Sequence, residues 1–572
     1  MMLSLFKRNI DEKVKVIFND KEKTASICGT HINYQPKCQS IIPISIKKDS
    51  EEYIITSILD EAFKEYKNCE SVKFLYNSKI TTIGKMAFYD SLITNITIHP
   101  QLIKIGEKAF IDSCIRKIDI PINSQLQTIE TGAFQGSYLE SIYIPPLVTE
   151  ISSNLFSFCH SLTKVKIPIN SQIQTIRSKA FFCCGSLKKI WIPPHVTRIC
   201  YASFAFCHSL HKIEIPWNSQ LQVIESCAIS YTQIESISIP SNIVELDECW
   251  CKGTPKLNKI KIISRSEKNI VYYENKLLLG KSDLNSENYD VLHFANRNIK
   301  TATIPSFVKT INSFSFEECS QLEYIEIPPN SELETIGYYA FHEILIDSIS
   351  IPSSIINLKS GWCCSTPKLN NIKILPRSEK NVVYYENKIL LGKSDLNSEN
   401  YDVLHFANRN IQSVTIPPFV KIIDSFSFEN CSQLKSIDIP THSELQIIDD
   451  CAFSYTSINK ICISNHITKI GKNAFFQCRE LQRIEISENS ELTEIDDKVF
   501  NESGIKSIYL PESLRKIKED TFSECENLLI IEMGRNISPT IIKCVIYSRS
   551  IFNWERKLII MIPPMFIQSI SK

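Results

Sequence analysis

LTKVKIPINSQIQTIRSKAFFCC (162–184) is the stretch that decides the fold, because both of its halves recur from end to end of the chain. The first half, L-x-x-I-x-I-P, returns at 139–145, 187–193, 210–216, 322–328 and 434–440. The second half, A-F-x-x-C, has counterparts at 202–207, 313–319, 425–431, 473–478 and 520–525. One period shared by a whole chain predicts a single solenoid rather than several globular domains. The search for function therefore turns to a long surface.

One aromatic position measures the repeat length. It falls at Phe63, Phe88, Phe110, Phe134, Phe156, Phe181, Phe204, Ile229, Trp250, Phe316, Phe341, Trp362, Phe428, Phe453, Phe475, Phe500 and Phe522. Most of the intervals are 21 to 25 residues, and two are 66. Long repeats carry connections such as NSQLQ (123–127), whereas short repeats carry tighter ones such as PPLVTE (145–150). Roughly seventeen repeats follow from this count.

The two long gaps contain a duplication. Residues 266–299 and 378–411 are identical at 32 of 34 positions, at an offset of 112 residues. In each copy a β-rich run, IVYYENKLLLGK (270–281) in the first, is followed by a second, YDVLHFANRNI (289–299). We expect each copy to form a hairpin inserted between repeats.

Each repeat has a physical interpretation. The alternation in L-x-x-I-x-I predicts a short strand with one buried face, and isoleucine suits a pleated surface. The proline that follows cannot donate to a ladder, so the strand ends there. I-x-x-I returns two apolar groups to the core, and A-F-x-x-C fits one tight turn, either 3₁₀ or α-helical. Stacked copies predict a β-rich solenoid with a parallel sheet, short helical or 3₁₀ turns and two duplicated hairpin insertions.

Composition fits a folded β-rich chain. Hydrophobic residues make up 43% and charged residues 22% of the 572 residues, which is too apolar for a disordered protein. The formal net charge is +0, so no overall field favours nucleic acid or an anionic membrane. The chain has 14 glycines, which leaves little room for glycine-rich phosphate loops.

The cysteines are expected to be reduced core residues. The chain has 21, an odd number, and many stand three residues after the repeat aromatic: Cys159, Cys184, Cys207, Cys319, Cys431, Cys478 and Cys525. A buried thiol in such a column behaves as a small hydrophobic group. Neighbouring pairs such as Cys249 and Cys251 lack zinc spacing and histidine partners, so we predict neither a metal nor a cofactor.

No catalytic constellation stands out. LLLGKSD (277–283, repeated at 389–395) resembles a phosphate-binding loop, but that loop needs a glycine where Asn275 and Asn387 stand. The histidines are scattered, without a paired nucleophile or acid that would mark a pocket. We therefore predict that the chain is not an enzyme.

The repeat resembles the BspA-like class of leucine-rich repeats, also called the Treponema pallidum type, with the pattern L-x-x-I-x-I-P-x-x-V-x-x-I-x-x-x-A-F-x-x-C. The resemblance covers about residues 55–535, for example 162–184 and 481–500. The duplicated block and the stretch 41–63 are similar to segments of trichomonad members. Known members are mostly surface antigens or adhesins that bind other proteins. The resemblance thus implies a protein-binding scaffold at a surface.

The domain plan follows from these segments. We expect an N-terminal β cap (1–54), repeats (55–265), an insertion (266–299), repeats (300–377), the duplicated insertion (378–411), repeats (412–535) and a C-terminal cap or degraded repeat (536–572). KVKVIFND (13–20) and KTASICG (23–29) alternate like a hairpin. KLIIMIPPMFIQSI (557–570) is too short for a membrane span, and MMLSLFKRN (1–9) does not look like a secretory signal.

The exposed face of the sheet is the predicted binding surface. The x residues of L-x-x-I-x-I point away from the core, and in repeats 162–215 they bring together Lys164, Lys166, Lys188, Lys189, Trp191, His211 and Lys212. A tryptophan among lysines is a reasonable anchor for a protein partner, although an ordinary solvated face has the same composition. Two functions stay open. The first is a surface-antigen-like adhesin, and the second is an intracellular interaction scaffold, which the missing signal and reduced cysteines favour. Neither reading involves nucleic acid or membrane insertion.

Overall fold

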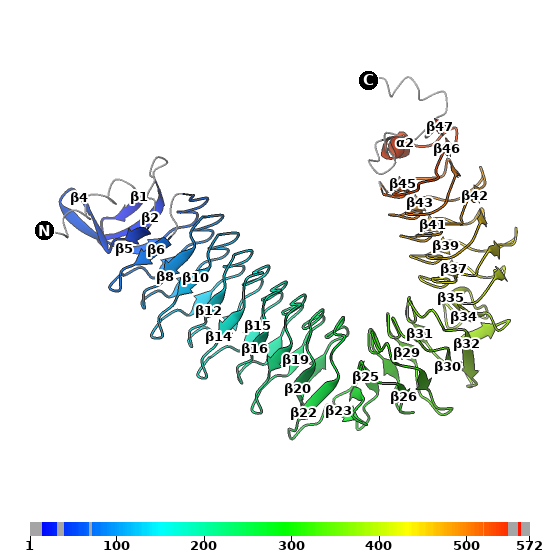
Figure 1. Cartoon of the computed structure of the whole chain (residues 1–572), viewed down its shortest axis with the longest axis horizontal. Coiled ribbons are helices and arrows are strands. Elements are labelled where there is room, and N and C mark those ends of the chain that lie inside the picture. The colour runs from blue at the N-terminus through cyan, green and yellow to red at the C-terminus, as the bar shows by residue number, and fades with distance from the viewer. Residues whose placement is uncertain (1–13, 31–38, 68–70, 519, 547–558, 562–572) are drawn as a thin grey trace. The chain divides into compact units, whose positions relative to one another are not determined.

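The computed structural model describes residues 14–30, 39–67, 71–518, 520–546 and 559–561 (Figure 1). The chain divides into two compact units, unit 1 ending at Glu287 and unit 2 beginning at Asn288. Each unit is a β-solenoid in which one repeat makes one turn, with about 21 turns altogether. The predicted solenoid is confirmed. The count exceeds seventeen because some turns, such as the one built from the insertion at 378–411, lack the repeat aromatic.

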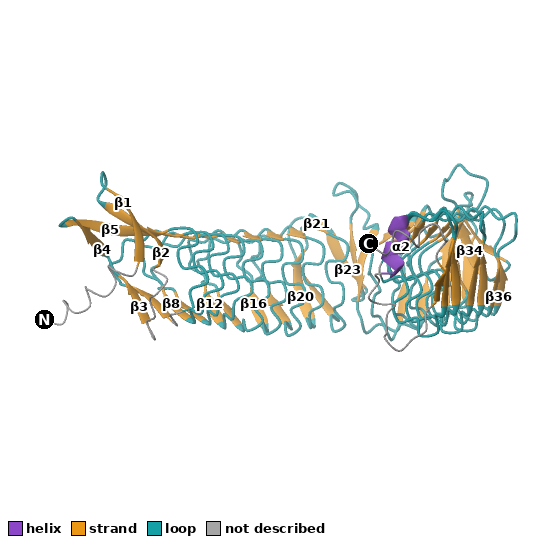
Figure 2. Ribbon diagram, turned by 90° about the horizontal axis from the view of Figure 1, so that it is seen from above, coloured by secondary structure: helices purple, strands orange, loops and turns teal. Residues whose placement is uncertain are grey.

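Two parallel sheets run along different sides of unit 1 (Figure 2). The first sheet contains the predicted L-x-x-I-x-I strands, with its ladder interrupted between β14 and β16 and between β18 and β20. Its members are β3 (Gln39–Ile42), β6 (Ser71–Phe74), β8 (Asn95–Thr97), β10 (Lys117–Asp119), β12 (Ser141–Tyr143), β14 (Lys164–Lys166), β16 (Lys189–Trp191), β18 (Lys212–Glu214), β20 (Ser236–Pro240) and β22 (Lys259–Ile263). The second sheet was not predicted. It consists mostly of two-residue strands from I-x-x-I: β5 (Glu51–Ile58), β7 (Thr82–Ile83), β9 (Lys104–Ile105), β11 (Thr128–Ile129), β13 (Glu150–Ile151), β15 (Thr175–Ile176), β17 (Arg198–Ile199), β19 (Val223–Ile224) and β21 (Glu245–Leu246).

Unit 2 repeats this plan. Its first-sheet strands are β26 (Thr301–Thr303), β28 (Tyr324–Glu326), β30 (Ser348–Pro352), β32 (Asn371–Leu375), β36 (Ser413–Thr415), β38 (Ser436–Asp438), β40 (Lys460–Ile463), β42 (Arg483–Ile486), β44 (Ser507–Leu510), β46 (Ile530–Met533) and β47 (Ile559–Met561). Its second-sheet strands are β25 (Val291–Ala295), β27 (Thr310–Ile311), β29 (Thr335–Ile336), β31 (Asn357–Leu358), β35 (Val403–Ala407), β37 (Ile422–Ile423), β39 (Ile447–Ile448), β41 (Lys469–Ile470), β43 (Glu494–Ile495) and β45 (Lys516–Ile517).

The A-F-x-x-C segments are overlapping turns, not the 3₁₀ or α-helical turns expected from the sequence. In the repeat around Phe110, every second amide bonds within the turn, as from Ile111 N to Lys108 O at 3.1 Å. The amides between them bond to the next repeat, as from Phe110 N to Ala133 O at 2.7 Å. Lys108 and Asp112 have φ of +55° and +54°, which a right-handed helix does not allow. Pairing with the neighbouring repeat thus replaces the helical ladder.

Stacked aromatic rings fill the core, as the spacing predicted. From Phe63 to Phe204 successive ring centroids lie 5.0 to 5.8 Å apart, with the ring planes stacked at angles of 2 to 23°. These distances are close to the spacing between strands. A cysteine column runs beside them. The thiol of Cys159 donates to Phe134 O at 3.0 Å, and that of Cys478 to Phe453 O at 3.0 Å. Burial raises the pKa of both thiols to about 12, so they stay protonated and serve as hydrogen-bond donors between repeats.

Strands also close the described ends. β1 (Val14–Asn19) and β2 (Thr24–Thr30) form the predicted antiparallel hairpin, and β4 (Ser45–Lys48) pairs antiparallel with β5. At the other end, helix α2 (Pro539–Ile546) follows the last repeat, and β47 extends the first sheet beside β46. Residues 1–9, predicted not to be a secretory signal, lie outside the described residues. Most of 557–570, predicted to belong to a C-terminal cap, lies outside them as well.

The second insertion is a three-stranded meander rather than a two-stranded hairpin. β33 (Val382–Tyr385) turns into β34 (Ile389–Gly392), which pairs antiparallel with β35. β35 then pairs parallel with β37 of the second sheet. In the first copy, β23 (Ile270–Tyr273) and β24 (Leu277–Gly280) form the matching hairpin. The insertion therefore ends inside the ladder of the solenoid.

The histidines of the two copies, His405 and His293, have different hydrogen-bond partners. His405 Nδ1 lies 2.8 Å from Asp424 Oδ2, and Ser360 donates to the other oxygen at 2.6 Å. At the corresponding place His293 Nδ1 lies 3.0 Å from the amide of Asn312. Burial acts to raise the pKa of Asp424, but hydrogen bonds from His405, Ser360 and the Ser425 amide hold it below its usual value. Burial lowers the pKa of His293 to about 4.

Asp424→Asn is expected to lower the free energy of unfolding at pH 7 by roughly 1–3 kcal/mol, because a buried charge-assisted hydrogen bond is lost. The depressed pKa stabilises the fold above the unfolded-state value of about 4, and this contribution disappears as pH falls through the folded-state pKa. Urea titrations of wild type and variant should therefore converge below about pH 4. Asn312→Asp is the reciprocal control. If the difference in the free energy of unfolding between wild type and Asp424→Asn stays constant with pH, the charge of Asp424 contributes nothing to stability.

Candidate functional site

The outer face of the first sheet in unit 1 carries all seven residues predicted from the sequence. Side chains alternate along a strand, so in β16 the middle residue, Ile190, is buried while the residues beside it face outward. The same alternation operates in β14 and β18. The predicted residues are distributed as Lys164 and Lys166 on β14, Lys188 and Lys189 before and on β16 with Trp191, and His211 and Lys212 before and on β18.

The positive charges on this face are largely uncompensated. Lys189 lies opposite Lys212 in the ladder. Lys212 pairs with Glu214 at 2.7 Å, and this contact lowers the pKa of Glu214. Within the described part of the chain, the other lysines of the patch make no ion pair: Lys164, Lys166, Lys188 and Lys189. Like charges on neighbouring strands repel one another, so an acidic ligand would stabilise this face.

The second sheet of the same unit shows the opposite arrangement. Its bases pair with acids of nearby repeats, as Lys104 does with Glu130 at 2.7 Å and Arg177 with Glu150 at 2.8 Å. Arg198 likewise lies 2.7 Å from Glu225. The patch therefore lacks the ion pairs that these bases of the second sheet make.

One detail of the predicted patch needs correction, because Trp191 is partly buried rather than exposed. His211 is exposed, and its Nδ1 lies 3.2 Å from Ser209 O. The strongly exposed tryptophan of unit 1 is Trp217, which sequence reasoning missed. Its signal was present, because Trp217 follows the proline that ends the strand and so lies in a turn.

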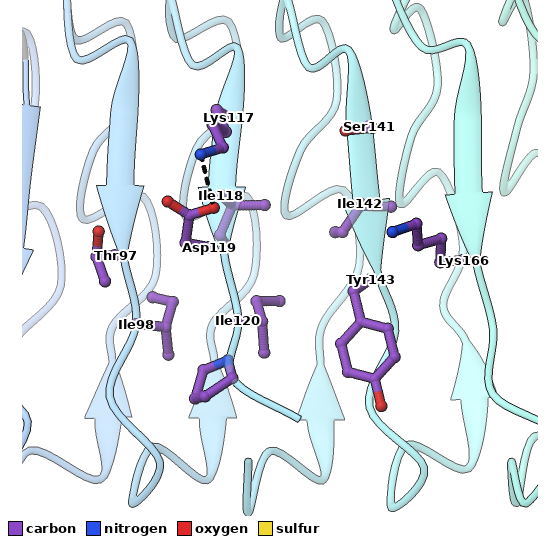
Figure 3. A pocket seen from close by; sticks show the side chains of 11 residues that line it. Thr97, Ile98, Lys117, Ile118, Asp119, Ile120, Ser141, Ile142, Tyr143 and Lys166 are labelled. Atoms are coloured by element: carbon purple, nitrogen blue, oxygen red, sulfur yellow. Dashed lines mark ion pairs between the residues drawn. The ribbon is translucent and has the colours of Figure 1, made fainter. Parts of the chain in front are cut away.

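A shallow pocket of about 370 Å³ lies next to the patch (Figure 3). It opens where β10 and β12 separate, since their ladder holds one residue pair, Lys117 with Ser141, whereas β10 and β8 share three. Asp119, Tyr143 and Lys166 come from successive strands at its rim. These three residues occupy the same x position in successive L-x-x-I-x-I strands, but the sequence did not predict a pocket there. Lys117 pairs with Asp119 at 3.0 Å, which leaves Lys166 as the unpaired charge of the pocket.

This arrangement can bind a ligand group. A phenol, a free ammonium group and exposed strand edges can receive one side chain of a partner. The described residues contain no group of three His, Cys, Asp or Glu side chains placed to hold a metal ion. Gly392 of the G-K-S sequence is the last residue of strand β34 and pairs with Val382 and Val403 on both sides, unlike the glycine of a phosphate loop. Among the described helices, none is long and apolar enough to cross a bilayer.

The repeats match a known family along most of the chain. The model of the BspA type leucine rich repeat region matches residues 37–163, 150–274, 291–401 and 402–529. The chain belongs to the BspA-type leucine-rich repeat family. This membership confirms the resemblance seen in the sequence and makes the chain a repeat scaffold of BspA type. The matched model describes a repeat region, not a catalytic domain.

This BspA-type protein is similar to several solved leucine-rich repeat structures. A leucine-rich cell surface protein of Faecalibacterium prausnitzii is 20% identical, with 94% of this chain and 96% of that chain covered and a TM-score of 0.37. The pneumococcal vaccine antigen PcpA is 14% identical, with coverage of 96% and 99% and a TM-score of 0.24. The Treponema pallidum leucine-rich repeat protein is 19% identical, with coverage of 37% and 82% and a TM-score of 0.25. A search of curated proteins found no match.

Proposed function

We propose that this BspA-type protein is a non-enzymatic protein-binding scaffold, and that it binds an acidic partner through the outer face of the first sheet in unit 1. The lysines without acid partners on β14 and beside β16 carry this proposal. Leucine-rich repeat proteins generally bind other proteins, which supports the class of partner. The pocket beside Tyr143 offers a place for one anchoring side chain.

A role at a cell surface, like that of antigens and adhesins of the family, is the leading form of this proposal. The alternative is an intracellular scaffold, and the cysteines favour it. All nineteen cysteines among the described residues are free, and several buried ones, such as Cys159 and Cys478, donate their thiol to a backbone oxygen, which suits a reducing compartment. Labelling of intact source cells with an impermeant biotin reagent separates the two, since only a surface protein is labelled before lysis.

Replacing the unpaired lysines of the face with serine is expected to weaken binding of the captured partner at least about tenfold. The partner is first isolated by affinity capture with the full chain and then titrated against wild type and the variant Lys164→Ser/Lys166→Ser/Lys188→Ser/Lys189→Ser. Wild-type affinity should also fall as the salt concentration rises, because exposed charges are screened.

The matched control removes the same number of charges from unit 2. Its variant carries serine at Lys368, Lys373, Lys435 and Lys506, all of which are exposed. This control should bind like wild type. Equal loss in both variants would assign the effect to net charge, and unchanged affinity in the first would exclude the face. A single-stranded oligonucleotide that bound as tightly as the captured protein would overturn the choice of partner class.

A further inference from the structure

Four apolar side chains stand out from one edge of unit 1. Tyr76, Ile122, Ile169 and Trp217 are 77%, 84%, 87% and 78% exposed. Each follows a first-sheet strand, after β6, β10, β14 and β18 respectively. They occupy every second turn, so neighbours are about 10 Å apart along the stack. We refer to these four residues as the apolar edge.

The turns hold these side chains in place. The Ser124 amide donates to Pro121 O at 3.0 Å, which closes a β-turn with Ile122 at its second position. The Ser124 hydroxyl then accepts from the Leu126 amide at 3.2 Å. The same pair of bonds recurs around Ile169 and Trp217. Because these serines are buried and hydrogen-bonded, the outward side chains sit on a rigid support.

The charge along the edge favours an anionic partner. From β6 to β18, the turns that follow the first-sheet strands contain no aspartate or glutamate: 75–79, 99–101, 121–125, 145–147, 168–172, 193–195 and 216–220. Lys79 lies three residues after Tyr76, and Lys166 lies three residues before Ile169. Both are exposed, and neither makes an ion pair with a residue that the structure describes.

Unit 2 has the same turns with different chemistry. Its counterparts are 328–332 (PPNSE), 440–444 (PTHSE) and 487–491 (SENSE), closed by the same serine bonds. The outward position holds Pro329, Thr441 or Glu488, and each turn ends in glutamate. The fold therefore does not require apolar side chains, or the absence of acidic ones, in these turns of unit 1.

We propose that the apolar edge of unit 1 docks on an anionic lipid interface. A protein partner would need a separate pocket for each protruding side chain, whereas lipid headgroups and upper acyl chains rearrange around any of them. Tyrosine and tryptophan, at the two ends of the row, are the side chains that prefer this interface. Nearby lysines add attraction to acidic headgroups. This contact is peripheral and requires no membrane span.

Sedimentation with vesicles tests the proposal directly. The full chain is mixed with phosphatidylcholine vesicles, with or without about 30% phosphatidylserine. Wild type should partition onto the acidic vesicles, more weakly onto neutral ones, and less at high salt. The variant Ile122→Gln/Ile169→Gln/Trp217→Gln should lose at least about tenfold in partitioning. Each replaced side chain is exposed, so folding should persist, which a circular dichroism melt checks.

The control variant removes exposed apolar groups elsewhere, with Tyr324→Gln and Leu529→Gln in unit 2. It should partition like wild type. The proposal is wrong if wild type binds neither vesicle, or if the edge variant binds as well as wild type. It is also wrong if the edge changes self-association alone, seen by light scattering as a dimer that the edge variant converts to monomer without any vesicle binding.

Discussion

Phe475→Ala is expected to lower the free energy of unfolding by about 3–5 kcal/mol. The Phe475 ring is fully buried and lies between two others, with centroids 5.4 Å from Phe453 and 5.7 Å from Phe500. Its removal leaves a cavity in a column whose neighbouring rings are fixed by the turns above and below. Urea unfolding followed by circular dichroism measures the change.

The next residue supplies the control. Phe476 is partly exposed and meets Tyr455 edge-on at 5.4 Å on the outer side of the turn. Phe476→Ala should cost about 1 kcal/mol, because one aromatic contact and partial burial are lost. If both alanine variants unfold at the same urea concentration, the stacked column is not what holds the repeats together.

Gly504→Ala is expected to destabilise the protein by about 3 kcal/mol, through overpacking against backbone. An added Cβ would lie 2.0 Å from the carbonyl oxygen of Arg479 and 2.9 Å from its carbon. The Gly504 amide also donates to Cys478 O at 3.1 Å, so this loop cannot withdraw without breaking a bond between repeats. No side-chain rotation relieves the clash.

Gly185→Ala is the matched substitution at an open site. Nothing lies within 4 Å of the Cβ that it adds. Thermal melts should show a clear loss for Gly504→Ala and no loss, or a slight gain, for Gly185→Ala. Similar melting temperatures for Gly504→Ala and wild type would mean that the backbone around Arg479 moves aside freely.

The sequence predicts what depends on the repeat period. Successive copies of L-x-x-I-x-I and A-F-x-x-C must stack, so the first sheet, the ring column and the buried cysteines follow from spacing alone. Six of the seven face residues are exposed, and Trp191 is partly buried. Strand alternation accounts for the direction of those that lie within the strands. These features need no knowledge of neighbouring repeats beyond their register.

Features made by contacts between repeats could not be predicted. The two-residue strands of the second sheet exist because the next repeat pairs with them, and Thr128–Ile129 carries no strand signal of its own. The turn around Phe110 avoids a helix for the same reason. The pocket opens where β10 and β12 separate, which no pattern records. Whether the side chain of Trp191 or that of Trp217 is exposed to solvent depends on the turn geometry of a single repeat.

The way the insertion ends bears on how this chain changes length. β35 is the last strand of the meander and also pairs with β37 of the second sheet. A duplicated segment therefore already contains the strand that connects it to the next repeat. The two blocks are almost identical over 34 residues and stand 112 residues apart. Unequal crossing-over between them would delete or add one 112-residue segment and leave the stacking register intact. Natural alleles that differ in length should therefore do so in whole steps of this size.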